Sequence, residues 1–318
     1  MKVVITGATG FIGKYLLQSL PDKYLPVILG RSKPAGFQGK YYKYDLHDEV
    51  IPTSAFVNAE VVIHTAARVH VMNDSSEFKY SLYKEANVDS TIRLAEHAFK
   101  NGVKRFIFIS SIKVNGESTL PNKPFSVSST RLPQDDYGRS KSEAEVELLK
   151  LADSTGLEVV IIRPTLVYGP GVKANFAAML KLVKKGVPLP FGGIKHNKRS
   201  FVSVRNLVDL ISTCIDHPNA VNQVFLVSDG KDLSTSEMVR LMGISTGKQG
   251  WQVPVPVWCF TLAGKIFGKS DIVNRLVGSL HVDISETINR LNWTPPQSIE
   301  EGFLEVAESI SKKNKVIG

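Results

Sequence analysis

The feature that most constrains the fold of this chain is a set of three glycines directly after its first apolar run. The segment VVITGATGFIGKYLL places Gly7, Gly10 and Gly13 between a Val- and Ile-rich stretch and an amphipathic one. Glycines at this spacing permit a tight turn and let a pyrophosphate approach backbone N–H groups at a helix N-terminus. Core packing alone would explain one of these glycines but hardly all three. The segment, with Phe11 and Ile12 inside it, therefore predicts a strand, a dinucleotide-binding turn and a helix rather than a signal peptide.

The same alternation of strand and helix continues to about residue 170. Runs that are nearly continuous in Val, Ile and Phe predict strands covered on both faces, at 2–6, 25–30, 59–67, 104–110 and 157–164. Stretches with helical periodicity predict helices at 11–20, 87–102 and 137–156. These repeated units predict an α/β fold with a doubly wound parallel Rossmann sheet, whose ligands bind outside the carboxyl ends of the strands.

The chain changes character after Pro170, where the elements become shorter and richer in Gly and Pro. The stretch 199–216 resembles a helix, and 223–229 resembles a strand that returns to the sheet. At 318 residues, two domains are expected. We predict a dinucleotide-binding domain of 1–170 plus about 200–230, and a smaller mixed C-terminal substrate domain of 171–199 and 231–318.

Charge and cysteine content limit the partners. The formal net charge is +9, but the basic residues are dispersed among acids and lack interleaved aromatics, so no nucleic-acid partner is expected. One local basic concentration, at 181–199, suits an anionic metabolite. Two cysteines are too few for a disulfide framework and indicate a reducing compartment, so we expect a cytoplasmic protein. The seven histidines form no metal-ligand pattern, and no metal is expected.

Membrane insertion is not expected, because no run of 18 or more apolar residues exists. The nearest candidate is VPVPVWCFTLAGKIFG, residues 253–268. Its prolines and Lys265 favour packing within the small domain. A surface amphipathic helix is the alternative that the sequence leaves open.

The residue that follows the second strand discriminates between cofactors. An acid there would bind the ribose hydroxyls of NAD, whereas an arginine can accept the 2′-phosphate of NADP. The sequence VILGRS offers Arg31 and no carboxylate, which favours NADP(H) over NAD(H), unless Arg31 is simply a surface residue. Further along, Asp45 and Leu46 stand where an adenine edge could be met. Ala66 and Ala67 end the strand expected at 59–67 and are small enough for the cofactor to approach the backbone.

A tyrosine and a lysine stand four residues apart on the helix expected at 137–156. This spacing brings Tyr137 and Lys141 onto one helix face. A nearby ammonium lowers the pKa of a phenol from its usual value of about 10, so that the phenol can exchange a proton with an alcohol oxygen. Ser111, just past the strand expected at 104–110, could hold that oxygen by a hydrogen bond. The three residues therefore form a candidate acid/base set for hydride transfer at a secondary alcohol.

These motifs resemble the extended short-chain dehydrogenases/reductases, in the nucleotide-sugar epimerase/dehydratase group that includes UDP-glucose 4-epimerase. The resemblance rests on TGATGFIG, DL, HTAA, NVDST, SSIKV, YGRSK, RPTLVYGPG, RSFVSV and LNWTPPQSIEEG, over nearly the full chain. It implies that Ser111 touches the substrate, that Tyr137 and Lys141 also contact the cofactor, and that the chain forms a homodimer. It places Asn87 and Pro164 near the cofactor, and Asn175, Arg199 and Arg275 at the diphosphate of a sugar nucleotide.

Departures from the family pattern favour one reaction. Dehydratases of the group carry an Asp–Glu pair after the serine, where this chain has Ile112 and Lys113. Together with Arg31, this favours an NADPH-dependent reductase of a 4-keto nucleotide sugar, with UDP as the carrier. The alternative is a UDP-glucose-type 4-epimerase with tightly bound NAD, because the same three catalytic residues serve both reactions. A third hypothesis is a non-catalytic dinucleotide sensor that retains the fold.

Overall fold

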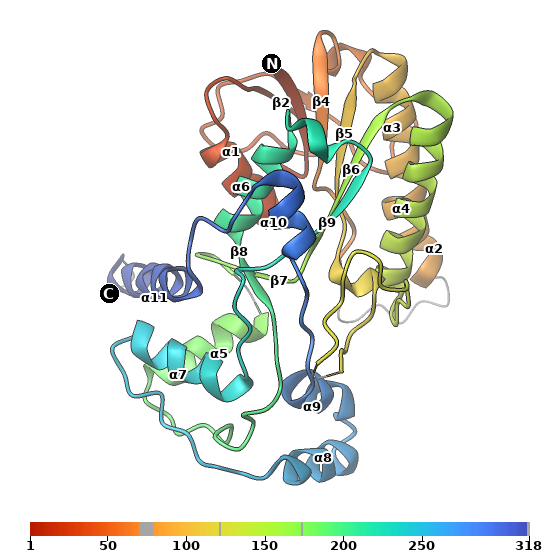
Figure 1. Cartoon of the computed structure of the whole chain (residues 1–318). Coiled ribbons are helices and arrows are strands. Elements are labelled where there is room, and N and C mark those ends of the chain that lie inside the picture. The colour runs from red at the N-terminus through yellow and green to blue at the C-terminus, as the bar shows by residue number, and fades with distance from the viewer. Residues whose placement is uncertain (70–78, 121, 173, 317–318) are drawn as a thin grey trace.

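The computed structural model describes residues 1–69, 79–120, 122–172 and 174–316. Its centre is a seven-stranded, fully parallel sheet in the order β3-β2-β1-β4-β5-β6-β9 (Figure 1). The strands are β1 Lys2–Thr6, β2 Leu25–Gly30, β3 Tyr41–Lys43, β4 Ala59–His64, β5 Arg105–Ile109, β6 Glu158–Pro164 and β9 Gln223–Val227. This order reverses direction beside β1, as a doubly wound sheet requires, and confirms the predicted fold class.

Helices cover both faces of the sheet. One face packs against α1 Phe11–Ser19 and α6 Val204–Cys214, through a core that includes Leu16 and Leu207. The other face packs against α3 Ser90–Lys100 and α4 Asp136–Thr155, through Leu94 and Leu148. The buried strands are therefore apolar on both sides, which is why their sequences show no alternation.

A third core lies below the sheet in Figure 1 and joins α5 Ala174–Lys184, α7 Thr235–Ser245 and α11 Ile299–Val316. Its centre is aromatic, because Tyr168 packs against Phe176, Phe201 and Phe303. The remaining helices are α2 Lys79–Lys84, α8 Val257–Ile266, α9 Ser270–Val277 and α10 Ser285–Leu291. The segments predicted as a smaller substrate domain supply most of this lower part, while the domain boundaries themselves stay a prediction.

Two sequence-based expectations need correction. The stretch 199–216 does not begin as a helix: Phe201–Ser203 forms β8, which pairs with β7 Leu166–Tyr168 in parallel. Ser203 then caps α6 by accepting a hydrogen bond from Asn206 N at 3.1 Å. The return to the sheet is confirmed, since β9 pairs with β6.

The second correction concerns α8, expected to pack inside the small domain. Gly264 is the only buried residue of that helix. Among the helices that the structure describes, none combines the length and the apolar character needed to cross a bilayer.

Candidate active site

A cavity of about 500 Å³ opens at the carboxyl ends of β1, β2 and β4. It is lined by seven of the residues predicted to bind the cofactor: Gly7, Gly10, Arg31, Asp45, Leu46, Ala66 and Ala67. These residues come from four separate loops, which the parallel topology brings to one edge of the sheet. The cavity is therefore the candidate dinucleotide site, although the contacts of each residue with a cofactor stay a prediction.

The glycine loop is packed too closely for side chains. Gly7 adopts φ +71°, and a Cβ there would lie 2.5 Å from Thr65 Oγ1 and 2.6 Å from Ala66 N. A Cβ on Gly13 would lie 2.7 Å from Ala8 Cα. The loop thus curls against the loop after β4 and leads directly into α1. This geometry fits a dinucleotide pyrophosphate, which needs bare backbone at the start of a helix.

Arg31 does not stand alone at the cavity edge. Its Nε lies 3.8 Å from Asp45 Oδ2, and the Arg31 side chain is 82% exposed. A carboxylate therefore faces the same part of the cavity as the guanidinium. An exposed pair of this length is weak, so it does not hold Arg31 in place to receive a phosphate.

The face of α4 that carries Tyr137 and Lys141 lies against the end of β5. Lys141 is 2% exposed, and its Nζ donates a hydrogen bond to Ile109 O at 2.8 Å. The same ammonium lies 4.3 Å from the centroid of the Phe108 ring. Ser111 follows β5 two residues later and caps the short 3₁₀ turn Ile112–Val114, where its Oγ accepts from Lys113 N. The predicted acid/base residues are thus gathered around one strand end.

Burial shifts the pKa values of this pair toward their neutral forms. It lowers the pKa of Lys141 to about 7, against the opposing effect of Glu145. It raises the pKa of Tyr137 well above its ordinary value, helped by Asp135 and Tyr83. The phenol of Tyr137 therefore keeps its proton in the free protein, and a positive charge nearby is needed before it can release it.

A buried network beneath Lys141 escaped the sequence analysis. Glu145, fully buried, accepts from Arg163 Nε at 2.9 Å and from Ser110 Oγ at 2.5 Å. Arg163 also donates to Asn115 Oδ1 at 3.1 Å. Glu145 stands four residues after Lys141, and this continued spacing was the one available signal. The network joins α4 to β6 and to the end of β5, and so fixes the position of the helix face that carries Tyr137 and Lys141.

Asn87 has a positioning role. It is 1% exposed and accepts from Arg68 N at 2.8 Å, while its Nδ2 donates to Arg68 O and to Ser140 Oγ, each at 3.0 Å. It therefore ties the cavity-lining loop after β4 to α4. Its predicted contact with the cofactor stays a prediction.

Five further predicted cofactor residues are not among those that line the cavity. Phe11 and Ile12 pack on the core beneath the glycine loop. Pro164 is the buried last residue of β6 and pairs with Val227. Tyr137 and Lys141 lie past the end of β5, further along the same edge of the sheet.

Two of the predicted substrate residues meet below that edge. Arg199 Nη1 donates to Arg275 O at 2.8 Å, and burial together with the charge of Arg275 lowers the pKa of Arg199. Arg275 Nη2 lies 3.3 Å from Glu117 Oε2, which also pairs with Lys113 at 2.7 Å from its Oε1. Two cations, Arg275 and Lys113, thus share Glu117, and Lys113 also pairs with Asp135. With Arg199 beside Arg275, the cluster holds three cations and two carboxylates, an arrangement that suits an added anion such as a diphosphate. Asn175 lies in the first turn of α5, but its side chain is outside the described part.

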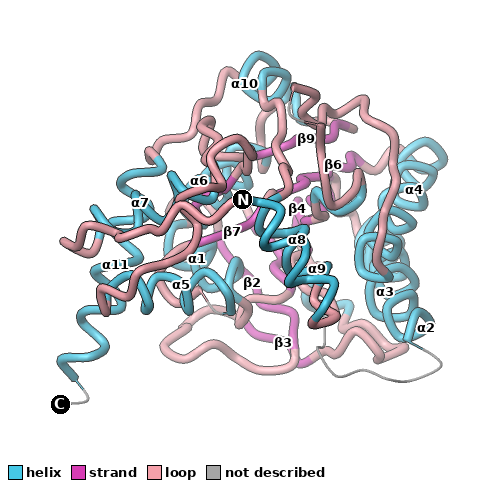
Figure 2. The backbone as a smooth tube through the Cα atoms, turned by 90° about the horizontal axis from the view of Figure 1, so that it is seen from below, coloured by secondary structure: helices cyan, strands magenta, loops and turns pink. Residues whose placement is uncertain are grey.

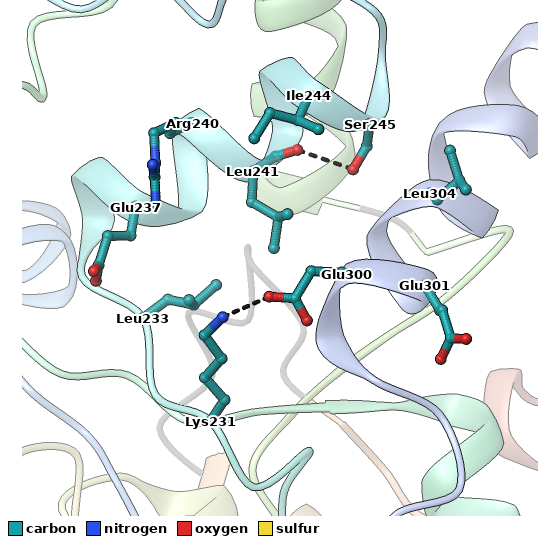
Figure 3. Close-up of a pocket in the computed structure, with 10 residues that line it drawn as sticks. All are labelled: Lys231, Leu233, Glu237, Arg240, Leu241, Ile244, Ser245, Glu300, Glu301 and Leu304. Carbon is teal, nitrogen blue, oxygen red and sulfur yellow. Dashed lines mark hydrogen bonds and ion pairs between the residues drawn. The ribbon is translucent and has the colours of Figure 1, made fainter.

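A second cavity, of about 440 Å³, lies between α7 and α11 (Figure 3). An ion pair between Lys231 and Glu300 crosses it at 2.5 Å. The lining residues are Lys231, Leu233, Glu237, Arg240, Leu241, Ile244, Ser245, Glu300, Glu301 and Leu304. None of these is a predicted site residue, so this cavity is separate from the candidate active site. The described residues contain no group of three or more His, Cys, Asp and Glu that could hold a metal ion.

Comparison with known proteins adds the family context. A family model described as the NAD dependent epimerase/dehydratase family matches residues 3–228. A UDP-glucose 4-epimerase of Vibrio cholerae is 53% identical over 315 residues, which cover 98% of this chain and 96% of that relative. An N-acetyl-alpha-D-glucosaminyl-diphospho-ditrans,octacis-undecaprenol 4-epimerase of Escherichia coli O157:H7 is 28% identical over 287 residues, covering 86% and 82%.

A solved structure shares the fold. The UDP-glucose 4-epimerase of Thermotoga maritima with UDP-glucose matches with a TM-score of 0.79 at 23% identity, over 99% of this chain and 100% of that one. A likeness at this identity speaks for the architecture alone.

Proposed function

We propose that this protein, which belongs to the NAD dependent epimerase/dehydratase family, is a 4-epimerase of UDP-linked sugars. The observation that supports proton and hydride transfer at C4 is the anchoring of the Tyr137–Lys141 helix face at the end of β5, beside Ser111. The 53% identity to a UDP-glucose 4-epimerase over nearly the whole of both chains favours this reaction. The reductase favoured by the sequence gains no such support, and the epimerase that stood as its alternative fits the relatives better.

NAD is the cofactor we propose, held by the glycine loop and by the loops that carry Asp45 and Ala66. The bare cradle formed by Gly7 and Gly13 supports this assignment. Bound there, NAD would supply reversible hydride transfer at C4 of the sugar. The preference for NADP gains no support, because the matching family is NAD dependent and Asp45 shares the cavity edge with Arg31.

The protein's own part in the reaction is proton transfer and positioning. Positive charge from Lys141 and from an oxidised nicotinamide would first favour loss of the phenol proton to solvent. The Tyr137 phenolate then accepts the proton of the sugar 4-hydroxyl and later returns it to the same oxygen. Lys141 supplies positive charge beside the phenol, and its hydrogen bond to Ile109 O holds the ammonium at the strand end. Ser111 donates a hydrogen bond to the sugar oxygen. With Ile112 and Lys113 after the serine, the carboxylate pair that would eliminate water is missing.

The substrate's diphosphate belongs at Arg199 and Arg275. Arg199 is rigidly placed, since its guanidinium bonds to the carbonyl oxygens of Arg275 and Gly278. Arg275 is exposed and free to turn from Glu117 toward a bound phosphate. The homodimer, the cytoplasmic location and the absence of a nucleic-acid partner stay predictions.

The test is to incubate the purified protein with UDP-glucose or UDP-N-acetylglucosamine, without added cofactor, and to follow C4 inversion by NMR. Denaturation of the same sample should release NAD. Inversion with NAD released supports the epimerase. An absence of inversion with all UDP-sugars, under conditions where the protein is folded and holds NAD, would refute it.

The 4-keto-sugar reductase is the second candidate, and Arg31 at the end of β2 is the observation that favours it. A protonated Tyr137 in the free protein also suits a group that donates to a keto oxygen. In that case the site should be empty on purification, NADPH should stabilise the protein more than NADH, and NADPH should be consumed only when a UDP-4-keto-sugar is added. The dinucleotide-sensor hypothesis requires neither activity, so either result would discard it.

A further inference from the structure

The helix pair α8–α9 lies at the lower end of the molecule (Figure 1), and several of its large apolar side chains are exposed. Trp258, Leu262 and Ile266 follow one another at intervals of four residues on α8, and they are 67%, 50% and 69% exposed. Phe267, at the end of the helix, is 73% exposed. Further exposed apolar side chains nearby belong to Trp251, Val253, Val257 and Ile272. We call residues 247–278 the α8–α9 lobe.

The lobe is fixed in place by contacts on its inner side. Leu189 N donates to Trp251 O at 2.9 Å, and Gly192 N donates to Val253 O at 3.1 Å. The Phe191 and Phe260 rings stack with centroids 6.1 Å apart. The loop 186–199 therefore packs against the lobe, and the opposite face of α8 is presented to the outside.

Basic residues predominate in the lobe and in the segment 181–199, which includes the loop packed against the lobe. Segments 181–199 and 247–278 together carry ten of the 39 basic residues and one of the 30 acidic ones. The rest of the chain carries 29 of each and is formally neutral. Lys265 and Lys269 flank the exposed stripe directly, at the end of α8 and just before α9.

We propose that the α8–α9 lobe docks on the surface of an anionic lipid bilayer. An exposed stripe of Trp, Leu and Ile flanked by lysines is the composition of a helix that lies in the headgroup region, with its apolar side chains inserted and its ammonium groups on lipid phosphates. Tryptophan in particular prefers that interface. A second copy of this chain fits less well, since a two-fold contact would bring two such positive faces together.

The lobe adjoins the substrate-binding residues. Arg275 lies in the last turn of α9, where its carbonyl accepts from Arg199 and its guanidinium pairs with Glu117. Viewed from below, α8 and α9 lie across the middle of the molecule (Figure 2). Docking would therefore hold the predicted diphosphate site close to the bilayer surface. This inference stands whether the reaction is epimerisation or reduction.

The experiment mixes the purified protein with vesicles of phosphatidylcholine alone, or with one part of phosphatidylglycerol to two of phosphatidylcholine. Binding is measured by co-sedimentation and by tryptophan fluorescence. Two of the three tryptophans, Trp251 and Trp258, are exposed in the lobe, whereas Trp293 is 6% exposed, so docking should shift the emission to shorter wavelength. We expect at least about tenfold stronger binding to the anionic vesicles, lost at high salt.

Variants assign the effect to the lobe. The triple substitution Trp258→Ser, Ile266→Ser, Phe267→Ser should abolish binding, and Lys265→Gln with Lys269→Gln should weaken it by roughly fivefold per lysine. The matched control, Val50→Ser with Val57→Ser, removes apolar side chains that are 82% and 57% exposed elsewhere, and should bind as the wild type does. Turnover of a soluble UDP-sugar should be unchanged in all three, which shows that they fold.

Three results would overturn the proposal. The first is no binding to anionic vesicles at low salt. The second is equal binding by the triple variant. The third is a stable oligomer in solution that the triple variant dissolves, since this would identify the face as a contact between protein chains.

Discussion

The sheet half of the molecule and the lower part below it build their sites in different ways. The candidate cofactor cradle is local: Gly7, Gly10 and Gly13 lie within one short loop, and Gly7 is in close contact with Thr65 Oγ1 and Ala66 N of the loop after β4. The proposed diphosphate site is assembled from distant parts of the chain, because Arg199 pairs through its backbone with Leu233 and through its side chain with Arg275, 76 residues away. Adding a single Cβ to the cradle should therefore impair its folding and cofactor binding. The proposed diphosphate site should instead be sensitive to the chemical type of the side chain at Arg199.

We expect the largest loss of activity from a substitution on the helix face that carries Tyr137 and Lys141. Tyr137→Phe removes the only proton that the phenol can exchange, so we expect kcat to fall by about 10³-fold. The NAD content should stay unchanged, because the ring remains. Tyr42→Phe, on the edge strand β3, is the control and should keep full activity. Retention of more than a tenth of the activity by Tyr137→Phe would remove this residue from the catalytic set.

Gly7→Ala tests whether the cradle is as tight as its geometry indicates. The added Cβ would meet Thr65 and Ala66 in a backbone conformation at φ +71°, so we expect a loss of roughly 2–4 kcal/mol of stability and of bound NAD. Gly36→Ala has nearly the same strain, at φ +76°, but no atom within 4 Å. It should cost only about 1 kcal/mol and leave NAD bound. Similar losses in the two variants, measured by chemical unfolding, would show that strain alone matters.

Lys141→Met should change activity and stability in opposite directions. Between its folded pKa of about 7 and its unfolded value, the unfolded chain holds a proton that the folded chain has released, so wild-type stability rises with pH over this window. The methionine variant lacks this dependence. It should be more stable than the wild type by roughly 1–3 kcal/mol near pH 7 and below, with the gain shrinking toward pH 10, and it should be inactive. A gain that is independent of pH would contradict the burial of a charged lysine.

Arg199→Lys should have the smallest effect, confined to the substrate. A lysine cannot reproduce the fork that binds a diphosphate and the two carbonyl oxygens, so we expect KM for the UDP-sugar to rise about tenfold with kcat nearly unchanged. Arg240→Lys, at the cavity of Figure 3, is the control and should leave KM as it is. An equal change in both variants, or a fall in kcat alone, would separate Arg199 from the diphosphate.

Much of the sheet half was predictable from the sequence. The strands β1, β2, β5 and β6 stand where the apolar runs predicted them, to within one residue at each end. Seven predicted cofactor residues share one cavity, because parallel strands end at the same edge. The interpretation of Arg31 as a marker of NADP gained no support. Asp45, on the loop after β3, lies across the cavity edge from Arg31, and the sequence alone does not show that the two residues are neighbours.

By itself, the sequence determined the features that depend on spacing within a few residues: the glycine turn, the strand–helix alternation and the helix face shared by Tyr137 and Lys141. Only the tertiary structure decided that Glu145 meets Arg163 beneath that face, and that Arg275 meets Glu117, 158 residues apart. It also decided that α8 turns its apolar stripe outward. Hydrophobic periodicity reports that a segment has an apolar face, but what covers that face depends on distant parts of the chain.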